Sequence, residues 1–113
     1  MIEHIHPSDL PDWLEKMRPY GQPVVLDVRE PSELRTASVK PEGFTLLTIP
    51  MGVIPPRLTE LKPEQPIACL CHHGARSMRV AAFLESRGFS RVANITGGIN
   101  AWSTQVDPAI PRY

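Results

Sequence analysis

Short runs of apolar, mostly β-branched residues recur along this chain, and prolines or glycines bound most of them. The runs predict strands at residues 24–28, 46–49, 67–70 and 92–95, with a weaker edge strand at residues 2–5. Continuous rather than alternating hydrophobicity is typical of strands that are buried on both faces of a parallel sheet. The chain is therefore expected to build its core around such a sheet.

Helix-forming segments lie between these runs, and they are expected at residues 9–17, 32–36, 53–61, 77–87 and 98–105. Ser8 and Ser77 are the expected N-caps of the first and the fourth of these helices, and Gly88 is expected to end the fourth. Strands that alternate with helices predict the α/β class. The expected architecture is a mostly parallel five-stranded sheet with helices on both faces.

Thirteen prolines divide the chain, but none lies between Ile67 and Asp107. Proline fixes φ and has no N–H donor, so it tends to mark the boundary of an element. The strand–helix–strand–helix pattern is therefore expected to be most regular in this proline-free part of the chain.

Length and composition indicate a single globular domain over residues 1–113, because 42% of the residues are apolar. The 12 basic and 12 acidic residues cancel, and no basic run is present, which argues against a nucleic-acid partner. No apolar stretch approaches the roughly 20 residues of a membrane span. The N-terminus resembles no secretory leader, so we expect a cytoplasmic protein with no membrane partner.

Two cysteines are present, and in a reducing compartment they are expected to be free thiols. Cys69 lies within an apolar strand and is expected to be inert core. Cys71 follows that strand in the segment Cys71-His72-His73-Gly74-Ala75-Arg76-Ser77, directly before a predicted helix. In open parallel sheets, ligands bind outside the carboxyl ends of strands, and a loop of amides at a helix N-terminus attracts anions.

A nucleophilic cysteine must be a thiolate, and a free cysteine is only about 3% ionised at pH 7. Making it mostly ionised takes roughly 2.7 kcal/mol, which exceeds the about 0.3–1 kcal/mol that a helix terminus supplies. Amide hydrogen bonds together with the charges of Arg76 and Arg79 could supply the difference. The alternative is that Cys71 is a small buried hydrophobe, as most free cysteines are.

The loop resembles that of the rhodanese family, C-x-x-G-x-R-S, at Cys71, Gly74, Arg76 and Ser77. The segment 25–30 (VLDVRE) is similar to the family's first core strand, and the segment 96–102 (TGGINAW) to its glycine-rich turn and closing helix. The resemblance extends from Pro7 to Tyr113. It is interrupted at residues 37–44, which are slightly longer than the family's usual G-H-I-P-G-A and lack its histidine.

The resemblance implies a single-domain bacterial thiosulfate sulfurtransferase in which Cys71 is the nucleophile. Thiosulfate or a similar small-molecule donor would leave a persulfide on Cys71, and cyanide or a thiol would accept the sulfur. The residues expected to bind substrate are His72, His73, Gly74, Ala75, Arg76 and Ser77. No metal and no organic cofactor is implied, and a thioredoxin-like or other thiol protein is a further expected partner.

Three other functions remain open at this point. A sulfur-relay or partner-binding module would use the same persulfide with little free turnover. A phosphatase or arsenate reductase has a C-x5-R loop, whereas Arg76 comes one position earlier here. A metal site built from Cys69, Cys71, His72 and His73 is disfavoured, because zinc ligands usually come in pairs from two separate segments.

Several other polar and aromatic residues are expected to have structural roles. Asp27 and Arg29 should fix a turn by an ion pair, and Trp13 and Trp102 should pack helices against the sheet. His4 and His6 are expected to be exposed on an edge strand. For His72 and His73, the alternative to a place at the mouth of the site is plain solvent exposure.

Overall fold

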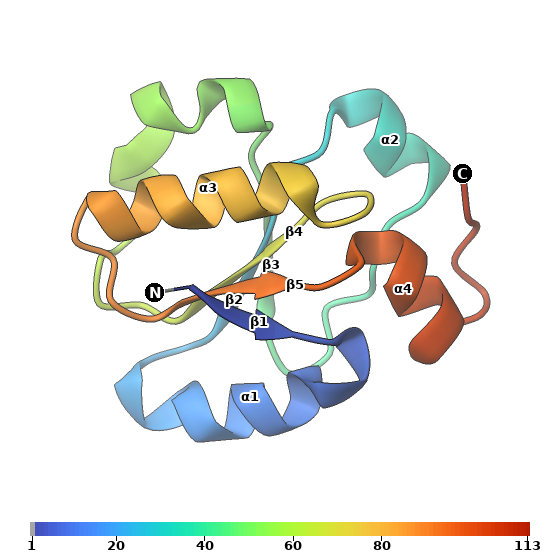
Figure 1. Ribbon diagram of the computed structural model, residues 1–113, viewed down its shortest axis with the longest axis horizontal. Helices are drawn as coiled ribbons and strands as arrows, with labels where there is room; N and C mark the ends of the chain where they lie inside the picture. The colour runs from blue at the N-terminus through green and yellow to red at the C-terminus, as the bar shows by residue number, and fades with distance from the viewer. Residues whose placement is uncertain (1) are drawn as a thin grey trace.

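A computed structural model describes residues 2–113, and its centre is one sheet of five parallel strands (Figure 1). The strand order is β1-β5-β4-β2-β3, so β4 and β2 are central neighbours and β1 and β3 are the edges. The strands are β1 (Glu3–Ile5), β2 (Val24–Asp27), β3 (Thr45–Thr48), β4 (Ile67–Leu70) and β5 (Val92–Ile95). The predicted α/β fold is confirmed, and the sheet is entirely parallel rather than mostly so.

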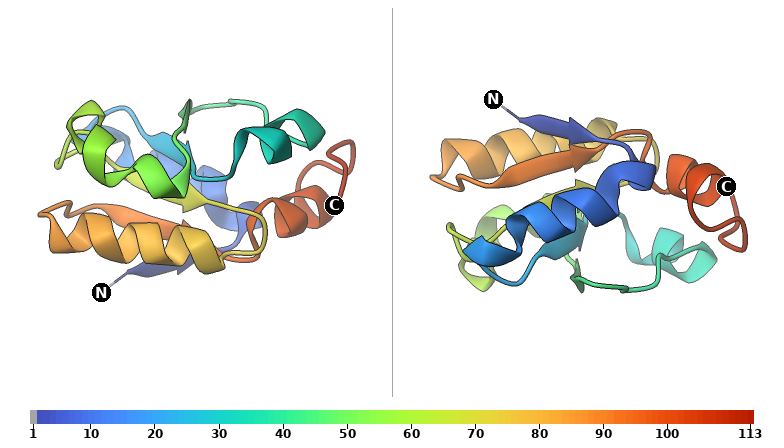
Figure 2. Two further views of the ribbon diagram at one scale, coloured as in Figure 1. Left: turned by 90° about the horizontal axis from the view of Figure 1, so that it is seen from above. Right: turned by 90° about the horizontal axis from the view of Figure 1, so that it is seen from below.

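Side chains that alternate along each strand divide the core between the two faces of the sheet. Val24, Leu26, Ile67 and Cys69 pack on one face, against α3 (Ala75–Ser86) and the 3-10 turns η3 (Met51–Val53) and η4 (Pro55–Glu60). The other face packs against α1 (Leu10–Met17) and α4 (Gly98–Gln105), with Trp13 and Trp102 buried as predicted. Figure 2 shows these layers from above and from below. The remaining elements are α2 (Pro31–Thr36) and the 3-10 turns η1 (Pro7–Asp9) and η2 (Arg18–Tyr20).

Three local predictions are wrong. Ser8 lies in η1 and Asp9 occupies the N-cap position of α1. Residues 53–61 form 3-10 turns rather than an α-helix, because prolines 55 and 56 interrupt the pattern of amide donors that a longer helix needs. Helix α3 begins at Ala75, two residues before Ser77, since Gly74 has a φ of 110° and occupies the N-cap position.

The turn after β2 is held by a buried ion pair between Asp27 and Arg29, as predicted. Arg29 Nη2 lies 2.7 Å from Asp27 Oδ2, and the side chains are 0% and 1% exposed. Arg29 also donates to the carbonyl of Ala37, at 2.8 Å. The pair therefore ties β2 to α2 and to the segment that follows it. Along residues 2–113 no helix has the length and apolar character needed to cross a membrane.

Candidate active site

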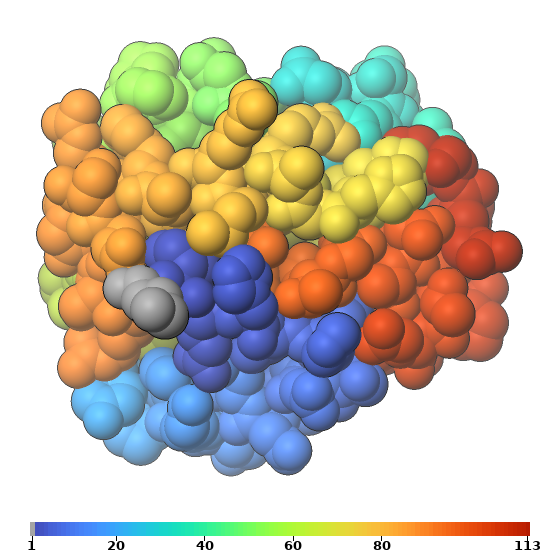
Figure 3. Space-filling view, viewed as in Figure 1, coloured from blue at the N-terminus to red at the C-terminus, as the bar shows by residue number. Residues whose placement is uncertain are grey.

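The candidate site lies at the carboxyl edge of the sheet, where β4 ends and α3 begins. Cys71 directly follows β4, and Gly74 occupies the N-cap position of α3. In the space-filling view the loop (yellow) lies beside the C-terminal segment (red), with the α2 region (cyan) next to it (Figure 3). Because β2 and β4 pair in parallel, the connections that follow them meet at this edge.

The sulfur of Cys71 is enclosed, since the residue is only 1% exposed. The Gly74 amide donates to Sγ at 3.0 Å, and the Ser77 hydroxyl lies 3.3 Å from Sγ. The sequence predicts a ring of amides around the sulfur. In the structure, the amide that donates to the sulfur is that of Gly74. Glycine is required there because a positive φ of 110° is a conformation that other residues rarely adopt.

Ser77 is buried within the first turn of α3, and its role differs from the predicted cap. Its hydroxyl donates to Asn94 Oδ1 at 2.6 Å, and Asn94 Nδ2 donates to the Gly74 carbonyl at 3.3 Å. Asn94 is 5% exposed on β5, where a polar side chain is stable only when hydrogen-bonded. The pair therefore connects β5 to the loop beneath the sulfur.

The N-terminus of α4 supports the loop from the other side. The amides of Ile99 and Asn100 donate to the carbonyls of Cys71 and His72, at 2.9 and 3.2 Å. Gly98 has a φ of 60°, and a Cβ built there would lie 2.4 Å from both of these carbonyl oxygens. The close approach of α4 to the loop thus depends on the absence of a side chain at this glycine.

Arg76 forms a two-pronged ion pair with Glu33 of α2. Nη1 and Nη2 lie 2.7 and 2.8 Å from Oε1 and Oε2. The Tyr113 hydroxyl donates to Glu33 at 2.7 Å and accepts a hydrogen bond from Arg29 at 3.0 Å. Hydrogen bonding from Arg76 lowers the pKa of Glu33 to about 2, and the same contact raises the pKa of Arg76. Arg76, the cation that the sequence predicts in the loop, is therefore paired with Glu33.

This ion pair predicts a pH dependence of stability. Glu33 has an ordinary pKa of 4.5 and a pKa of about 2 in the folded protein. Because the pKa is lower in the folded protein, the ion pair should make its full contribution to the free energy of unfolding above pH 4.5. That contribution should disappear as the pH falls towards 2. Urea denaturation should show wild type to be more stable than Glu33→Gln at pH 6, with the two curves converging near pH 2. A difference that persists at pH 2 would exclude the carboxylate as its source.

His72 lies in a stack of rings at the mouth of the loop. Its ring centroid is 3.8 Å from that of Tyr113, with an interplanar angle of 6°, and 3.8 Å from that of His73. His72 Nε2 is enclosed, and among the described residues no partner lies within hydrogen-bond distance. Burial lowers the pKa of His72, which favours the neutral ring. His72 is half-buried, whereas His73 is exposed.

The remaining sequence-predicted residues lie around this centre. Ala75 is exposed at the first position of α3, and Arg79 is exposed one turn beyond Arg76, beside Met51 and Phe83. Cys69 is fully buried, and burial raises the pKa of its thiol. His4 and His6 are exposed, as predicted. In the part of the chain that the structure describes, no three His, Cys, Asp or Glu side chains converge on a possible metal position.

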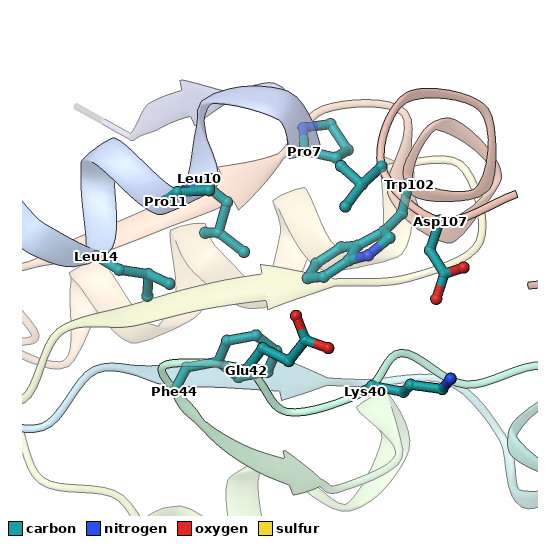
Figure 4. Close-up of a pocket in the computed structure, with 10 residues that line it drawn as sticks. Pro7, Leu10, Pro11, Leu14, Lys40, Glu42, Phe44, Trp102 and Asp107 are labelled. Atoms are coloured by element: carbon teal, nitrogen blue, oxygen red, sulfur yellow. The ribbon is translucent and has the colours of Figure 1, made fainter.

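A separate cavity of about 380 Å³ lies between α1, α4 and the segment 37–44, where the sequence departs from the family pattern. Leu10, Leu14, Phe44 and Trp102 line its interior, and Lys40, Glu42 and Asp107 stand at its rim (Figure 4). None of the loop residues 71–77 lines it. The departing segment therefore shapes another part of the surface, and the candidate site lies elsewhere.

Sequence reasoning missed three residues at the site: Glu33, Asn94 and Tyr113. Asn94 offered one signal, since it is a polar residue inside an otherwise apolar strand. Glu33 and Tyr113 offered none, because they contact the site across 43 and 80 residues of sequence.

Comparison with known proteins finds one family over most of the chain. A family model described as a rhodanese-like domain matches residues 10–105. A sulfurtransferase from Allochromatium vinosum is 33% identical over 87 residues, which cover 77% of this chain and 78% of that protein. The rhodanese-like/PpiC domain-containing protein 12 of Arabidopsis thaliana is 47% identical over 91 residues. Those residues are 79% of this chain but only 30% of the plant protein.

Solved structures show the same architecture. A rhodanese-like domain protein from Staphylococcus aureus has a TM-score of 0.75 at 26% identity, over 99% of each chain. A rhodanese-related protein from Thermoplasma volcanium also has a TM-score of 0.75, at 27% identity over 98% of this chain and 99% of that one. The residues that the family model matches include β2 to β5, the Cys71 loop and the whole of α4.

Proposed function

Because this chain belongs to the rhodanese-like domain family, we propose that it is a sulfurtransferase in which Cys71 carries sulfur as a persulfide. Thiosulfate or a similar compound donates the sulfur, and cyanide or a thiol accepts it. The proposed setting is the cytoplasm, where both thiols stay reduced. The observation that carries the proposal is the position of Cys71, whose sulfur accepts the Gly74 amide at the N-terminus of α3.

The first half-reaction is a displacement at sulfur. The Cys71 thiolate attacks the outer sulfur of thiosulfate, the S–S bond to sulfite breaks, and sulfite leaves with the bonding electron pair. The transferred sulfur remains on Cys71 as an anionic persulfide. In the second half-reaction, cyanide attacks that outer sulfur, thiocyanate leaves, and the electron pair returns to Cys71 as thiolate.

The loop suits this chemistry because its backbone can hold an anion. The first amides of a helix have no intrahelical acceptor, which leaves those of Ala75, Arg76 and Ser77 available at the start of α3. The carbonyls of Cys71 and His72 bond to α4. The C=O and N–H groups of a trans peptide point in opposite directions, so the next amides face away from α4. Preorganised donors of this kind stabilise a developing negative charge.

Peptide mapping by mass spectrometry after treatment with thiosulfate tests the proposal directly. We expect one added sulfur atom, on the peptide that contains Cys71, and its removal by cyanide with formation of thiocyanate. Sulfur on Cys69, or no added sulfur with any donor, would contradict the proposal.

Arg76 is proposed to help bind the anionic donor, so Arg76→Ala should weaken thiosulfate loading by about tenfold or more. The loss has two sources, since the substitution removes a cation and leaves the Glu33 carboxylate unpaired. Pre-steady-state loading of Cys71 at several thiosulfate concentrations would measure it. A loading rate equal to that of wild type would show that Arg76 plays no part in donor binding.

A sulfur-relay module that passes the persulfide to a thiol protein is the second candidate. A similar protein from Bacillus subtilis, 31% identical over 74% of this chain, is named a putative sulfur carrier protein. Persulfide that persists with cyanide but transfers to reduced thioredoxin would distinguish a carrier from a turnover enzyme.

A further inference from the structure

The charge of the loop arginine is cancelled by a carboxylate from another helix. Both Glu33 oxygens are engaged by Arg76, at 2.7 and 2.8 Å, and the side chains are 18% and 31% exposed. The Tyr113 hydroxyl adds a third hydrogen bond to Glu33. A planar guanidinium that meets a carboxylate at two points forms one of the stronger protein ion pairs. Arg76 is thus held beside a fixed negative charge.

The two basic side chains that contact Tyr113 add no free positive charge. Arg29, which contacts the same Tyr113, is paired with Asp27 and fully buried. Burial lowers the pKa of His72, which favours its uncharged form. Arg79 is exposed and lies beside Met51 and Phe83, at a cavity that none of the loop residues 71–76 lines.

The charge of the sulfur donor determines how strongly Glu33 opposes it. Coulomb energy is proportional to the product of the charges, so the attraction of Arg76 and the repulsion of Glu33 are both twice as large for a dianion as for a monoanion at the same distance. The attraction that Glu33 cancels is therefore also twice as large for the dianion. Thiosulfate carries two negative charges, whereas an organic persulfide, R–S–S⁻, carries one on its sulfur. Pairing with Glu33 therefore cancels more of the attraction of Arg76 for thiosulfate than for an organic persulfide.

We propose that Glu33 is a specificity-determining residue, which makes Cys71 select a singly charged organic persulfide over dianionic thiosulfate. The inference rests on the proposed persulfide chemistry and deepens it by naming the class of donor. In the step concerned, the Cys71 thiolate attacks the outer sulfur of R–S–S⁻ and the S–S bond of the donor breaks. The thiolate R–S⁻ leaves with the electron pair, and Cys71 retains the persulfide anion.

Glu33→Gln tests the charge while keeping an oxygen that can accept from Arg76. Loading of Cys71 would be timed with thiosulfate, with cysteine persulfide and with a persulfidated cysteine peptide. Wild type should load faster from both persulfides than from thiosulfate. In Glu33→Gln, the ratio of thiosulfate loading to cysteine persulfide loading should rise about tenfold. Faster loading by the peptide than by free cysteine persulfide would indicate a protein-borne donor, and the reverse a small-molecule donor.

Glu64→Gln is the matched control, because it removes the same charge from an exposed residue before β4, at the opposite end of that strand from the loop. It should leave the ratio at the wild-type value. An unchanged ratio in Glu33→Gln, or a preference of wild type for thiosulfate, would overturn the inference while leaving sulfur transfer intact.

Alkylation of Cys71 separates this inference from the proposed function, because it requires no sulfur transfer. Iodoacetate is an anion and iodoacetamide is neutral, so the ratio of their rates reports the field at the sulfur. Glu33→Gln should raise that ratio about threefold, and added salt should change the wild-type ratio by less than about twofold. A wild-type ratio that falls steeply with salt would reveal an unpaired cation and overturn the inference, even if the variant failed to fold. Failure of every donor to load Cys71 would overturn the proposed function as well.

Discussion

Replacement of Cys71 by serine should abolish persulfide formation, a loss of more than about a thousandfold in sulfur loading. A serine hydroxyl is almost entirely protonated at neutral pH and is a poor nucleophile towards sulfur. The fold should survive, because serine is smaller than cysteine and the Gly74 amide and the Ser77 hydroxyl can bond to its oxygen. Mass spectrometry after thiosulfate treatment measures the loss, and circular dichroism reports the fold.

Cys69→Ala provides the matched control for this substitution. Cys69 is fully buried on β4, and burial raises the pKa of its thiol, which makes it a poor nucleophile. The variant should load sulfur at close to the wild-type rate, with a modest loss of stability from the small cavity. If Cys69→Ala loses loading while Cys71→Ser retains it, the roles of the two cysteines are exchanged.

Gly98→Ala should both destabilise the protein and disable the loop. The added Cβ would lie 2.4 Å from the carbonyl oxygens of Cys71 and His72, at a φ of 60° that disfavours any side chain. Backbone strain and overpacking together should cost about 3 kcal/mol, or roughly 10–15 °C in Tm. Because α4 must move away from the loop, sulfur loading should fall more than about tenfold. Thermal unfolding and the loading assay measure the two effects.

Gly52→Ala is the corresponding control, because no atom lies within 4 Å of a Cβ at that position and its φ is not positive. The change should be neutral, or should stabilise by about 0.4–1 kcal/mol through the unfolded chain. Equal losses in both variants would show that the contact between α4 and the loop is unimportant.

The strands and the reactive loop could be predicted because their signals are local. Val24 to Asp27, Ile67 to Leu70 and Val92 to Ile95 are short apolar runs, and each forms the strand that the pattern predicts. The start of α3 was misplaced because the sequence does not display that Gly74 has a φ of 110°. The N-cap of α1 differs from the prediction because Pro7–Asp9 form the turn η1 directly before the helix, and Asp9 at the N-cap position makes no side-chain cap hydrogen bond.

The paired state of Arg76 could not be predicted, although Arg76 itself was singled out. Its partner Glu33 lies 43 residues away, on a helix that follows a different strand. The parallel pairing of β2 with β4 is what brings the two helix N-termini together. Tyr113 reaches Glu33 across 80 residues, and Asn94 reaches Ser77 from β5.

By itself, the sequence determined that the Cys71 sulfur lies at the end of a strand and that the backbone after Cys71 can turn around it. These properties depend on residue type and on spacing over a few positions, which the unfolded chain already carries. Only the tertiary structure decided what charge surrounds that sulfur and what supports the loop beneath it. Electrostatic and packing energies depend on distances through space, and folding sets those distances between residues that lie far apart in the chain.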